Sequence, residues 1–222
     1  MNFSNEKINT NFYSRQIFTY GMDTMNLFIK YKILIIGLRG LGFEVCKNII
    51  LAGPKNLTIF DNNTLKINDL SSNFCLEEKD VKLKKRRDES CLEYFKELNP
   101  YTNVNILDLN ENIFNSCEIK DENIFLNFDV VVVTEILHSN VINQIENVCR
   151  KNKKGFIYGL VLGLSGFVFD DFGNEFEIKD LTGEKKEKYF IKNIYYDENI
   201  KESIIEIDLN ENNMLKLKKK IL

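Results

Sequence analysis

The stretch YKILIIGLRGLGFEVCKNIILAGPKNLTIFD, residues 31–61, decides the fold class of this chain. It opens with a continuous apolar run that ends at Gly37, a pattern typical of a parallel strand buried on both faces. Residues 41–52 follow with apolar side chains at helical spacing, and a Gly-Pro pair then ends the helix. The run 56–61 predicts a second strand, which finishes on Asp61. Strand, glycine-rich turn, helix and strand in this order predict a βαβ unit with a parallel sheet.

The alternation of strands and helices continues along most of the 222 residues. Further strands are expected over residues 103–109, 128–135 and 155–163, and further helices through residues 91–98 and 141–150. The expected fold class is therefore α/β, a Rossmann-like doubly wound sheet with flanking helices.

The two ends of the chain depart from this pattern. Residues 1–12 are polar and are expected to form a flexible tail, and residues 13–30 suggest short helical pieces. Residues 166–178 alternate apolar and polar side chains around residues 171–174, which predicts a β-hairpin that turns there. Short strand-like runs such as YFIKNIYY and SIIEIDL then predict a partial small β module at the C-terminus.

Composition excludes several classes of function. With 30 basic and 33 acidic residues the net charge is −3, whereas a nucleic-acid partner requires a dominant basic surface. The longest uncharged apolar stretch, residues 156–169, is too short and too rich in glycine to span a membrane. No secretory signal is visible at the N-terminus, so a cytoplasmic and nuclear location is expected.

Neither the cysteines nor the basic run predicts a reactive site. The chain has no CxxC pair and a single histidine, His138, which is expected to be an exposed loop residue. No metal site is therefore predicted, and the five cysteines are expected to be reduced structural thiols: Cys46, Cys75, Cys91, Cys117 and Cys149. The run KLKKRR (82–87) is expected to be a solvated approach to a helix.

The segment GLRGLG carries the strongest chemical signal, because nucleotide-binding folds place such a loop between a strand and a helix to receive phosphate. Gly37, Gly40 and Gly42 are the candidate nucleotide-binding residues of this loop. Arg39 stands at the middle position of GxGxxG, where a side chain obstructs close approach of phosphate. Asp61 is placed to hold a ribose, or to serve as a structural hydrogen-bond acceptor at the strand end. The pattern predicts a degenerate nucleotide loop.

Several segments together resemble the N-terminal, inactive adenylation half of ubiquitin-activating enzymes (E1), within the ThiF/MoeB-like family. They occur in the family's order: YSRQIFTYG, IIGLRGLGFEVCKNIILAGPKNLTIFD, DLSSNFCLEEKDV, ELNPYTNV and LSGFVFDDFGNEF. The resemblance implies three parts. Residues 1–12 form the flexible tail, residues 13–176 the inactive adenylation domain, and residues 177–222 part of the first catalytic-cysteine half-domain, a small β module.

In this family two adenylation halves pair as a pseudo-dimer, and the ATP site lies in the active half. The sequence departs from the active half at each diagnostic position. Arg39 replaces a glycine, Asn63 stands in place of a second acid, and the segment from Asp69 to Asn73 replaces an arginine-bearing one. No aspartate follows VVVVTEILH where a metal ligand is expected. The resemblance thus implies that this chain alone is inactive, and that ATP and Mg²⁺ are bound mainly by the active half.

One residue of this half is expected to serve catalysis. The R-Q pair of YSRQ resembles the family's arginine that reaches across the pseudo-dimer to the ATP phosphates of the other half, and in this sequence that residue is Arg15. A guanidinium is permanently charged and can bind phosphate oxygens through two donors. The simpler alternative is that Arg15 is a surface or capping arginine.

The function that the resemblance implies is part of an ATP-dependent ligase. Such an E1 adenylates the ubiquitin C-terminus and then forms a thioester, so the implied partners are the active half, ubiquitin and, through regions outside this sequence, E2 conjugating enzymes. Three alternatives remain open: the small regulatory subunit of a heterodimeric SUMO-type E1, an NAD(P)-dependent Rossmann oxidoreductase, and a binding module without a role in ATP chemistry.

Overall fold

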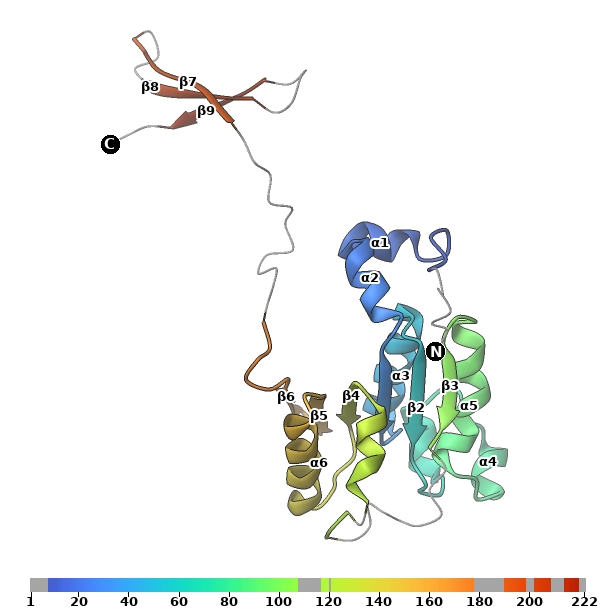
Figure 1. Ribbon diagram of the computed structural model, residues 1–222. Coiled ribbons are helices and arrows are strands. Elements are labelled where there is room, and N and C mark those ends of the chain that lie inside the picture. The colour runs from blue at the N-terminus through green and yellow to red at the C-terminus, as the bar shows by residue number, and fades with distance from the viewer. Residues whose placement is uncertain are drawn as a thin grey trace, which may run out of the picture. The chain divides into compact units, whose positions relative to one another are not determined.

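The computed structural model describes residues 8–107, 117–119, 121–177, 190–198, 202–208 and 214–219. The chain divides into two compact units, residues 1–177 and residues 178–222 (Figure 1). The first seven residues of the expected tail, the end of the strand expected over 103–109, and parts of the C-terminal module lie outside the described residues.

The first unit is built on a six-stranded sheet in the order β3-β2-β1-β4-β5-β6. All neighbouring strands run parallel except β5 and β6, which are antiparallel. The strand bounds are β1 (Lys32–Ile36), β2 (Asn56–Phe60), β3 (Asn103–Ile106), β4 (Val130–Val133), β5 (Gly155–Leu162) and β6 (Ser165–Asp171). The predicted Rossmann-like doubly wound sheet is confirmed, since the order reverses between β1 and β4.

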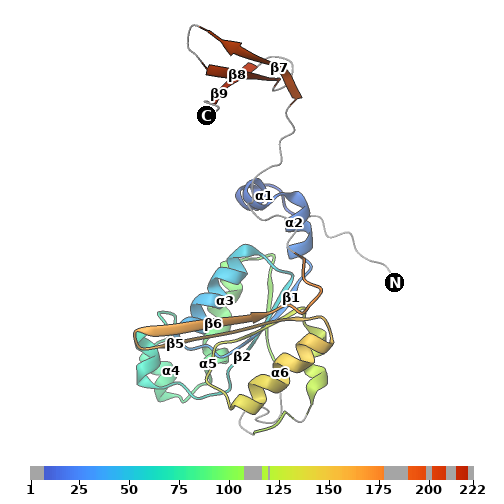
Figure 2. The ribbon, with the colours of Figure 1, turned by 90° about the vertical axis from the view of Figure 1, so that its left-hand side faces the viewer.

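Helices cover both faces of this sheet. In Figure 2, α3 and α6 lie on opposite sides of the β5–β6 ribbon. The helical elements are α1 (Ser14–Tyr20), α2 (Met22–Phe28), α3 (Gly40–Ala52), α4 (Glu78–Lys82), α5 (Arg87–Leu98) and α6 (Ser139–Lys151), with two 3₁₀ turns, η1 (Ile67–Ser71) and η2 (Glu122–Asn127). The predicted helical pieces over residues 13–30 are thus α1 and α2.

The two faces of β1 enter two separate hydrophobic cores, which explains its continuous apolar sequence. Ile33 and Ile35 pack on the side of α3 and α5, whereas Leu34 and Ile36 pack on the side of α6 and η2. Both cores are made from side chains that alternate along the strands and from one face of each covering helix. The carboxyl ends of β1, β2 and β4 therefore meet at one edge of the unit.

The β-hairpin predicted to turn at residues 171–174 is wrong. Residues 165–171 instead form β6, which folds back on β5 so that Leu162 pairs with Ser165. The turn is Gly163-Leu164, and Gly163 has a positive φ of 63°, which the first residue of a two-residue hairpin turn requires. Alternation of apolar and polar residues identified the strand correctly but could not identify its partner.

The start of the described chain packs against the α5–β3 connection. The Asn9 side-chain amide donates to the Tyr101 hydroxyl at 2.6 Å, and the Phe12 ring lies 5.0 Å from the Tyr101 ring. Tyr13 is buried, and the Asn99 amide donates to its hydroxyl at 3.0 Å. These contacts hold the chain leading into α1 at the amino ends of β2 and β3.

The second unit contains a three-stranded antiparallel sheet in the order β7-β8-β9. Its strands are β7 (Phe190–Asp197), β8 (Glu202–Asp208) and β9 (Met214–Lys219). The first two coincide with the strand-like runs YFIKNIYY and SIIEIDL, whereas β9 was not expected within the lysine-rich end. Of the helices that the structure describes, none has the length and apolar character needed to cross a bilayer.

Candidate functional site

The glycine-rich loop joins β1 to α3 and packs tightly against the end of β4. Gly37 has a φ of 95°, and a Cβ added there would lie 2.7 Å from the Glu135 Cβ. A Cβ added at Gly42 would overlap the carbonyl oxygen of Gly37. The Thr134 hydroxyl donates to that same oxygen at 2.8 Å. Both glycines are therefore required by the packing of the loop itself, whether or not a phosphate is bound.

The amino end of α3, where a phosphate would be received, is covered by other parts of the chain. A Cβ added at Gly40 would lie 2.8 Å from the Ser72 Cβ, so the segment after η1 approaches this position closely. Arg39 precedes the helix, and its Nε lies 3.2 Å from Oε2 of Glu135. Arg39 thus places a half-exposed side chain at the middle position of the loop, where it forms an ion pair with Glu135.

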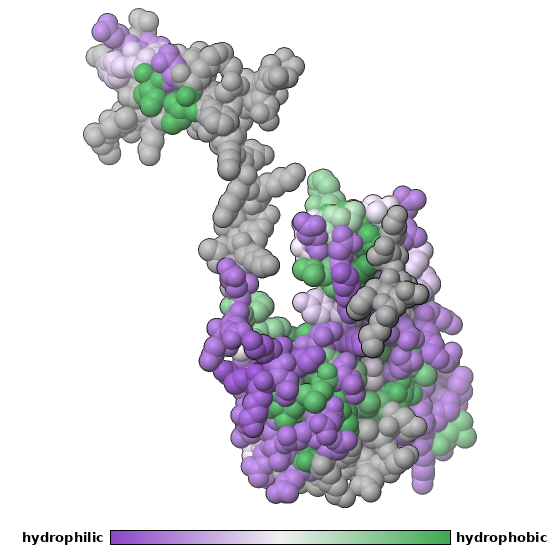
Figure 3. Space-filling view, viewed as in Figure 1, coloured by the Kyte–Doolittle hydropathy of each residue, from purple (hydrophilic) through white to green (hydrophobic). Residues whose placement is uncertain are grey.

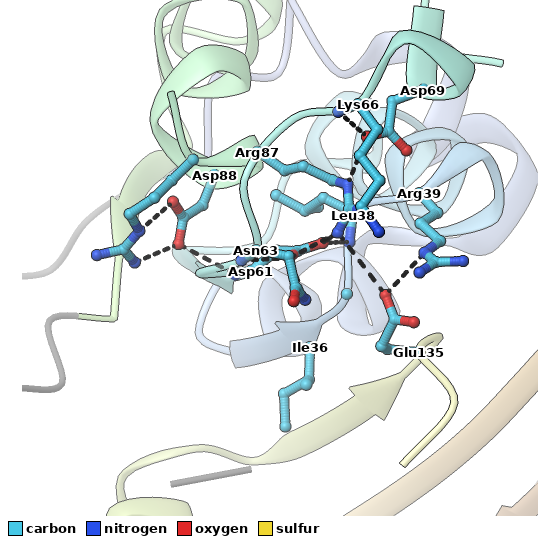
Figure 4. Close-up of polar contacts among 12 residues, drawn as sticks. Ile36, Leu38, Arg39, Asp61, Asn63, Lys66, Asp69, Arg87, Asp88 and Glu135 are labelled. Carbon is cyan, nitrogen blue, oxygen red and sulfur yellow. Dashed lines mark hydrogen bonds and ion pairs between the residues drawn. The ribbon is translucent and has the colours of Figure 1, made fainter. Parts of the chain in front are cut away.

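Asp61 is buried at the end of β2, and both of its carboxylate oxygens are bonded within the chain (Figure 4). The backbone N–H of Leu38 donates to Oδ2 at 2.8 Å, and that of Asn63 donates to Oδ1 at 3.1 Å. The Arg87 guanidinium donates to the two oxygens at 3.0 and 3.1 Å. The acid that could hold a ribose is therefore engaged by the loop, by its own strand end and by a buried cation.

Arg87 corrects the expectation that KLKKRR is solvated throughout. This last residue of the run is only 1% exposed, and its Nε also donates to Oδ2 of Asp69 at 3.1 Å. Burial opposes its charge, but the attraction of Asp61 and Asp69 outweighs burial and raises the pKa of the guanidinium. Spacing could not reveal these pairings, because the acids lie 26 and 18 residues away in the sequence.

The contacts join into one set, which we call the crevice network: Arg39, Asp61, Asp69, Arg87 and Glu135 (Figure 4). Glu135 follows β4 and lies 4.0 Å from the Arg87 guanidinium, in addition to its contact with Arg39. Burial raises the pKa of Glu135, while the charge of Arg39 acts against that rise. Sequence reasoning identified Asp61 as a site candidate but missed Asp69, Arg87 and Glu135.

Asp88 and Arg86 hold the backbone of Asp61 in place. The buried carboxylate of Asp88 accepts the backbone N–H of Asp61 at 3.0 Å. Arg86 holds the same carboxylate with two donors, at 3.0 and 2.6 Å. Burial raises the pKa of Asp88, against the opposing effect of Arg86. The start of α5 therefore fixes the end of β2 through two consecutive residues, Arg87 and Asp88.

Little space remains in the crevice once these side chains are in place. The cavity between the carboxyl ends of β1, β2 and β4 measures about 20 Å³, whereas pockets that hold small ligands measure ~300–1000 Å³. Its size matches roughly a single water molecule. In the parts of the chain that the structure describes, no group of three or more His, Cys, Asp or Glu side chains is placed to hold a metal ion. The residues present do not fit a nucleotide.

Arg15 lies in a different place from the other candidates. It is exposed on α1, and among the described residues its guanidinium has no hydrogen-bond or ion-pair partner. In Figure 1, α1 and α2 lie beside the amino end of β1, away from the carboxyl end where Gly37, Gly42 and Asp61 lie. The structure therefore brings the loop glycines and Asp61 together but leaves Arg15 apart from them.

Two exposed apolar surfaces flank the sheet. The first, on α1 and α2, includes Phe18, whose side chain is 93% exposed, and hydrophobic side chains mark this end of the unit in Figure 3. The second lies on the β5–β6 hairpin, where Val168 is 74% exposed and Leu164 is fully exposed.

His138, which is also exposed, caps the start of α6, because its Nδ1 accepts the N–H of Asn140 at 3.2 Å.

The strand order and the helices on both faces of the sheet define a Rossmann-like α/β domain. The sequence model of the ThiF family matches residues 13–177. The chain is 37% identical over 182 residues to ubiquitin-activating enzyme E1 1 of Candida albicans, covering 82% of this chain and 17% of that protein. It is 36% identical over 196 residues to human ubiquitin-like modifier-activating enzyme 6, covering 87% of this chain and 18% of that protein.

A solved structure agrees with the architecture. E. coli MccB with succinimide aligns with a TM-score of 0.62 at 20% identity, covering 75% of this chain and 50% of that chain, a likeness that shows the fold alone. The chain belongs to the ThiF family, and the resemblance to E1 enzymes is confirmed. It spans less than a fifth of the length of the curated E1 relatives that it matches, at 17% and 18%.

Proposed function

We propose that this chain is the inactive adenylation half of a ubiquitin-activating E1. In such an enzyme the ubiquitin C-terminus is adenylated with ATP and then transferred to a catalytic cysteine, which lies outside this chain. Membership of the ThiF family and identity to E1 enzymes support the class of reaction. The crevice network carries the finer assignment, because it fills the position where a nucleotide would lie.

The first role we assign to this half is structural. Exposed apolar side chains gather on α1, α2 and the β5–β6 hairpin, and exposed apolar patches mark interaction sites. Packing of the active adenylation half against them would bury side chains such as Phe18 and Val168. ATP and Mg²⁺ are then bound by the active half, and this half holds that partner in place.

The second role is chemical and rests on Arg15. An exposed guanidinium without a partner among the described residues is available to a phosphate group on another domain. Its position at the opposite end from the crevice favours action on a site outside this unit. There it would stabilise the negative charge that develops as the ubiquitin carboxylate attacks the α-phosphate and pyrophosphate leaves.

Ubiquitin and the active half are the partners proposed for the complete enzyme, with E2 enzymes engaged by regions outside this sequence. The three-stranded sheet of the second unit is consistent with a role as part of the first catalytic-cysteine half-domain. We propose the cytoplasm and nucleus as its location.

The test of inactivity is ATP–pyrophosphate exchange. The purified chain with ATP, magnesium and ubiquitin should give no exchange above a protein-free blank, because its crevice cannot admit ATP. A complete E1 assayed in parallel shows that the reagents work. Exchange by the isolated chain that rises with its concentration would overturn the assignment. The same preparation should not bind NAD(H), and clear binding would favour the oxidoreductase alternative.

The ubiquitin and SUMO-type alternatives differ in the size of the native polypeptide. Capture from source cells with an antibody to this chain should yield one polypeptide several times heavier than 26.0 kDa, as expected for a one-chain E1. A small chain that co-purifies with a larger cysteine-bearing subunit would instead favour a heterodimeric E1. A small chain recovered alone would favour the binding-module alternative.

A further inference from the structure

Two cysteine sulfurs lie in contact beside the crevice network. Cys75 lies between η1 and α4 and is half-buried, whereas Cys91 is buried on α5. Their Sγ atoms are 3.6 Å apart. Neither thiol has a part in the proposed function, and both belong to elements that close the crevice.

The Asn73 side chain holds the two thiols face to face. Its Oδ1 accepts from the Cys75 thiol at 3.0 Å, and its Nδ2 donates to Cys91 Sγ at 3.3 Å. Because Asn73 is itself buried, this arrangement is fixed by the fold. A disulfide has an S–S distance of ~2.05 Å, so the sulfurs need to approach by roughly 1.5 Å, a movement within the range of side-chain rotation.

The two thiols differ in the way that a reactive pair requires. The hydrogen bond that joins the two thiols lowers the pKa of Cys75, although burial opposes this. The pKa of Cys91 is raised, first by this shared hydrogen bond and then by burial. Burial also raises the pKa of Cys46, and it raises the pKa of Cys149 to about 12. Cys75 is therefore the thiol suited to attack an oxidant, and Cys91 is the thiol suited to attack the oxidised Cys75 sulfur.

We propose that Cys75 and Cys91 form a reversible disulfide when the protein meets a peroxide. The Cys75 thiolate attacks one oxygen of hydrogen peroxide, the O–O bond breaks, and the leaving hydroxide takes up a proton to give water and a sulfenic acid. The Cys91 sulfur then attacks Cys75 Sγ, the S–O bond breaks, and hydroxide leaves with the Cys91 proton as a second water. Two thiols are oxidised and one peroxide is reduced to two waters.

The position of the pair gives this bond a structural consequence. Cys75 follows Asp69 in the same connecting segment, and Cys91 lies one helical turn after Arg87 on α5. The Asp69–Arg87 ion pair already joins these two elements at 3.1 Å. A disulfide would join them covalently at a second point, and oxidation would then hold the crevice network in place.

The test is peptide mapping of the full chain. Native protein is treated with hydrogen peroxide, its remaining thiols are alkylated, and it is digested with trypsin. We expect a disulfide-linked pair of peptides, residues 67–79 with residues 88–96, and the loss of two of the five free thiols. Dithiothreitol should restore both thiols. Amide exchange over residues 67–75 should slow in the oxidised protein, because the segment is then tied to α5.

Three variants make the result specific. Cys75→Ser and Cys91→Ser should each abolish the linked peptides, while Cys117→Ser, which removes an exposed thiol, should leave them unchanged. Mapping of the wild-type chain stands even where a variant fails to fold. The proposal would be overturned if both Cys75 and Cys91 could still be alkylated after peroxide had oxidised Cys117. Linked peptides that appear only after unfolding in urea would overturn it as well.

Discussion

Arg87 is the residue whose surroundings most restrict the crevice. Its guanidinium is almost inaccessible to water and lies between the carboxylates of Asp61 and Asp69. A buried ion pair gains little over apolar packing, but the loss of one partner leaves a charge buried without compensation. Arg87 therefore matters less as a source of net stability than as the counter-charge that joins Asp61 to Asp69.

Removal of the Arg87 cation should lower the stability of the fold considerably. Arg87→Met should lower the free energy of unfolding by ~3–5 kcal/mol, because Asp61 and Asp69 lose their counter-charge. Urea denaturation followed by circular dichroism measures the change, since the chain has no tryptophan. Lys82→Met in the exposed part of the same basic run is the control and should stay within ~0.5 kcal/mol. Equal effects of the two changes would contradict this account of Arg87.

Asp80 connects stability to pH. Its carboxylate accepts from the Lys85 ammonium at 2.7 Å and from the backbone N–H of Glu77 at 3.3 Å. The Lys85 hydrogen bond is the main cause of the lowered pKa of Asp80, although burial opposes it. A carboxyl whose pKa is lower in the folded state stabilises fully above its unfolded pKa of ~3.9, and this contribution is lost as the pH falls through the lowered value.

Asp80→Asn should therefore destabilise the chain at neutral pH and lose this effect in acid. Unfolding free energies of the wild-type and variant chains, compared at decreasing pH, should differ most near pH ~7 and converge below pH ~4. A difference that stays constant down to the acid limit of folding would show that Asp80 does not titrate as its contacts imply.

At the scale of elements, the turn between β1 and α3 is held together by its own atoms. The Gly37 carbonyl oxygen accepts from Thr134 and leaves no room for a Cβ at Gly42. Gly159 in β5 offers a contrast, because an added Cβ there would meet its nearest atoms at an ordinary 3.8 Å. Gly42 and Gly159 therefore differ in the space that their surroundings leave for a Cβ.

Gly42→Ala should lower the free energy of unfolding by ~1–3 kcal/mol, since the loop or β4 must shift to accept the methyl group. Gly159→Ala should change it by no more than ~0.5 kcal/mol. Both are measured by the same urea titration. A Gly42→Ala variant as stable as the wild type would mean that the loop relaxes freely, and the packing explanation of this glycine would then fail.

Elements whose apolar residues follow a regular spacing could be predicted from the sequence, whereas pairings between residues distant in sequence could not. β1 and α3 follow from apolar spacing alone, because that spacing determines which faces are buried. The pairing of β6 with β5 depends instead on a turn at Gly163, which has a positive φ. A turn at residues 171–174 fitted the sequence pattern equally well. In the site, Asp61 was predictable from its place at a strand end. Arg87 was not, because its partners are distant in sequence.

At the scale of the whole molecule, the separation of Arg15 from the crevice is the decisive feature. One unit carries an exposed arginine at the amino ends of its strands and a filled crevice at the carboxyl ends. A group at one end cannot serve a site at the other. Any role of Arg15 in phosphate chemistry therefore requires a second domain, as the proposed pairing of two adenylation halves supplies.

In a complete E1, Arg15→Ala should slow ubiquitin adenylation by about tenfold or more, because losing one charged transition-state contact costs on the order of 2–4 kcal/mol. ATP–pyrophosphate exchange measures the rate. Lys30→Ala removes an exposed cation near the end of α2 and should leave the rate unchanged. Thermal unfolding should not move in either variant. An unchanged rate for Arg15→Ala would favour a purely architectural role for this half.

The filled crevice also determines how many changes it would take to open a nucleotide site at this edge of the sheet. A change of Arg39 to glycine would restore the GxGxxG letters, yet Arg87 would still bind Asp61, and Ser72 would still cover the start of α3. Removal of Arg87 alone would leave buried Asp61 and partly buried Asp69 without their counter-charge, at a cost in stability. Opening the crevice to a nucleotide therefore requires several coordinated changes at once.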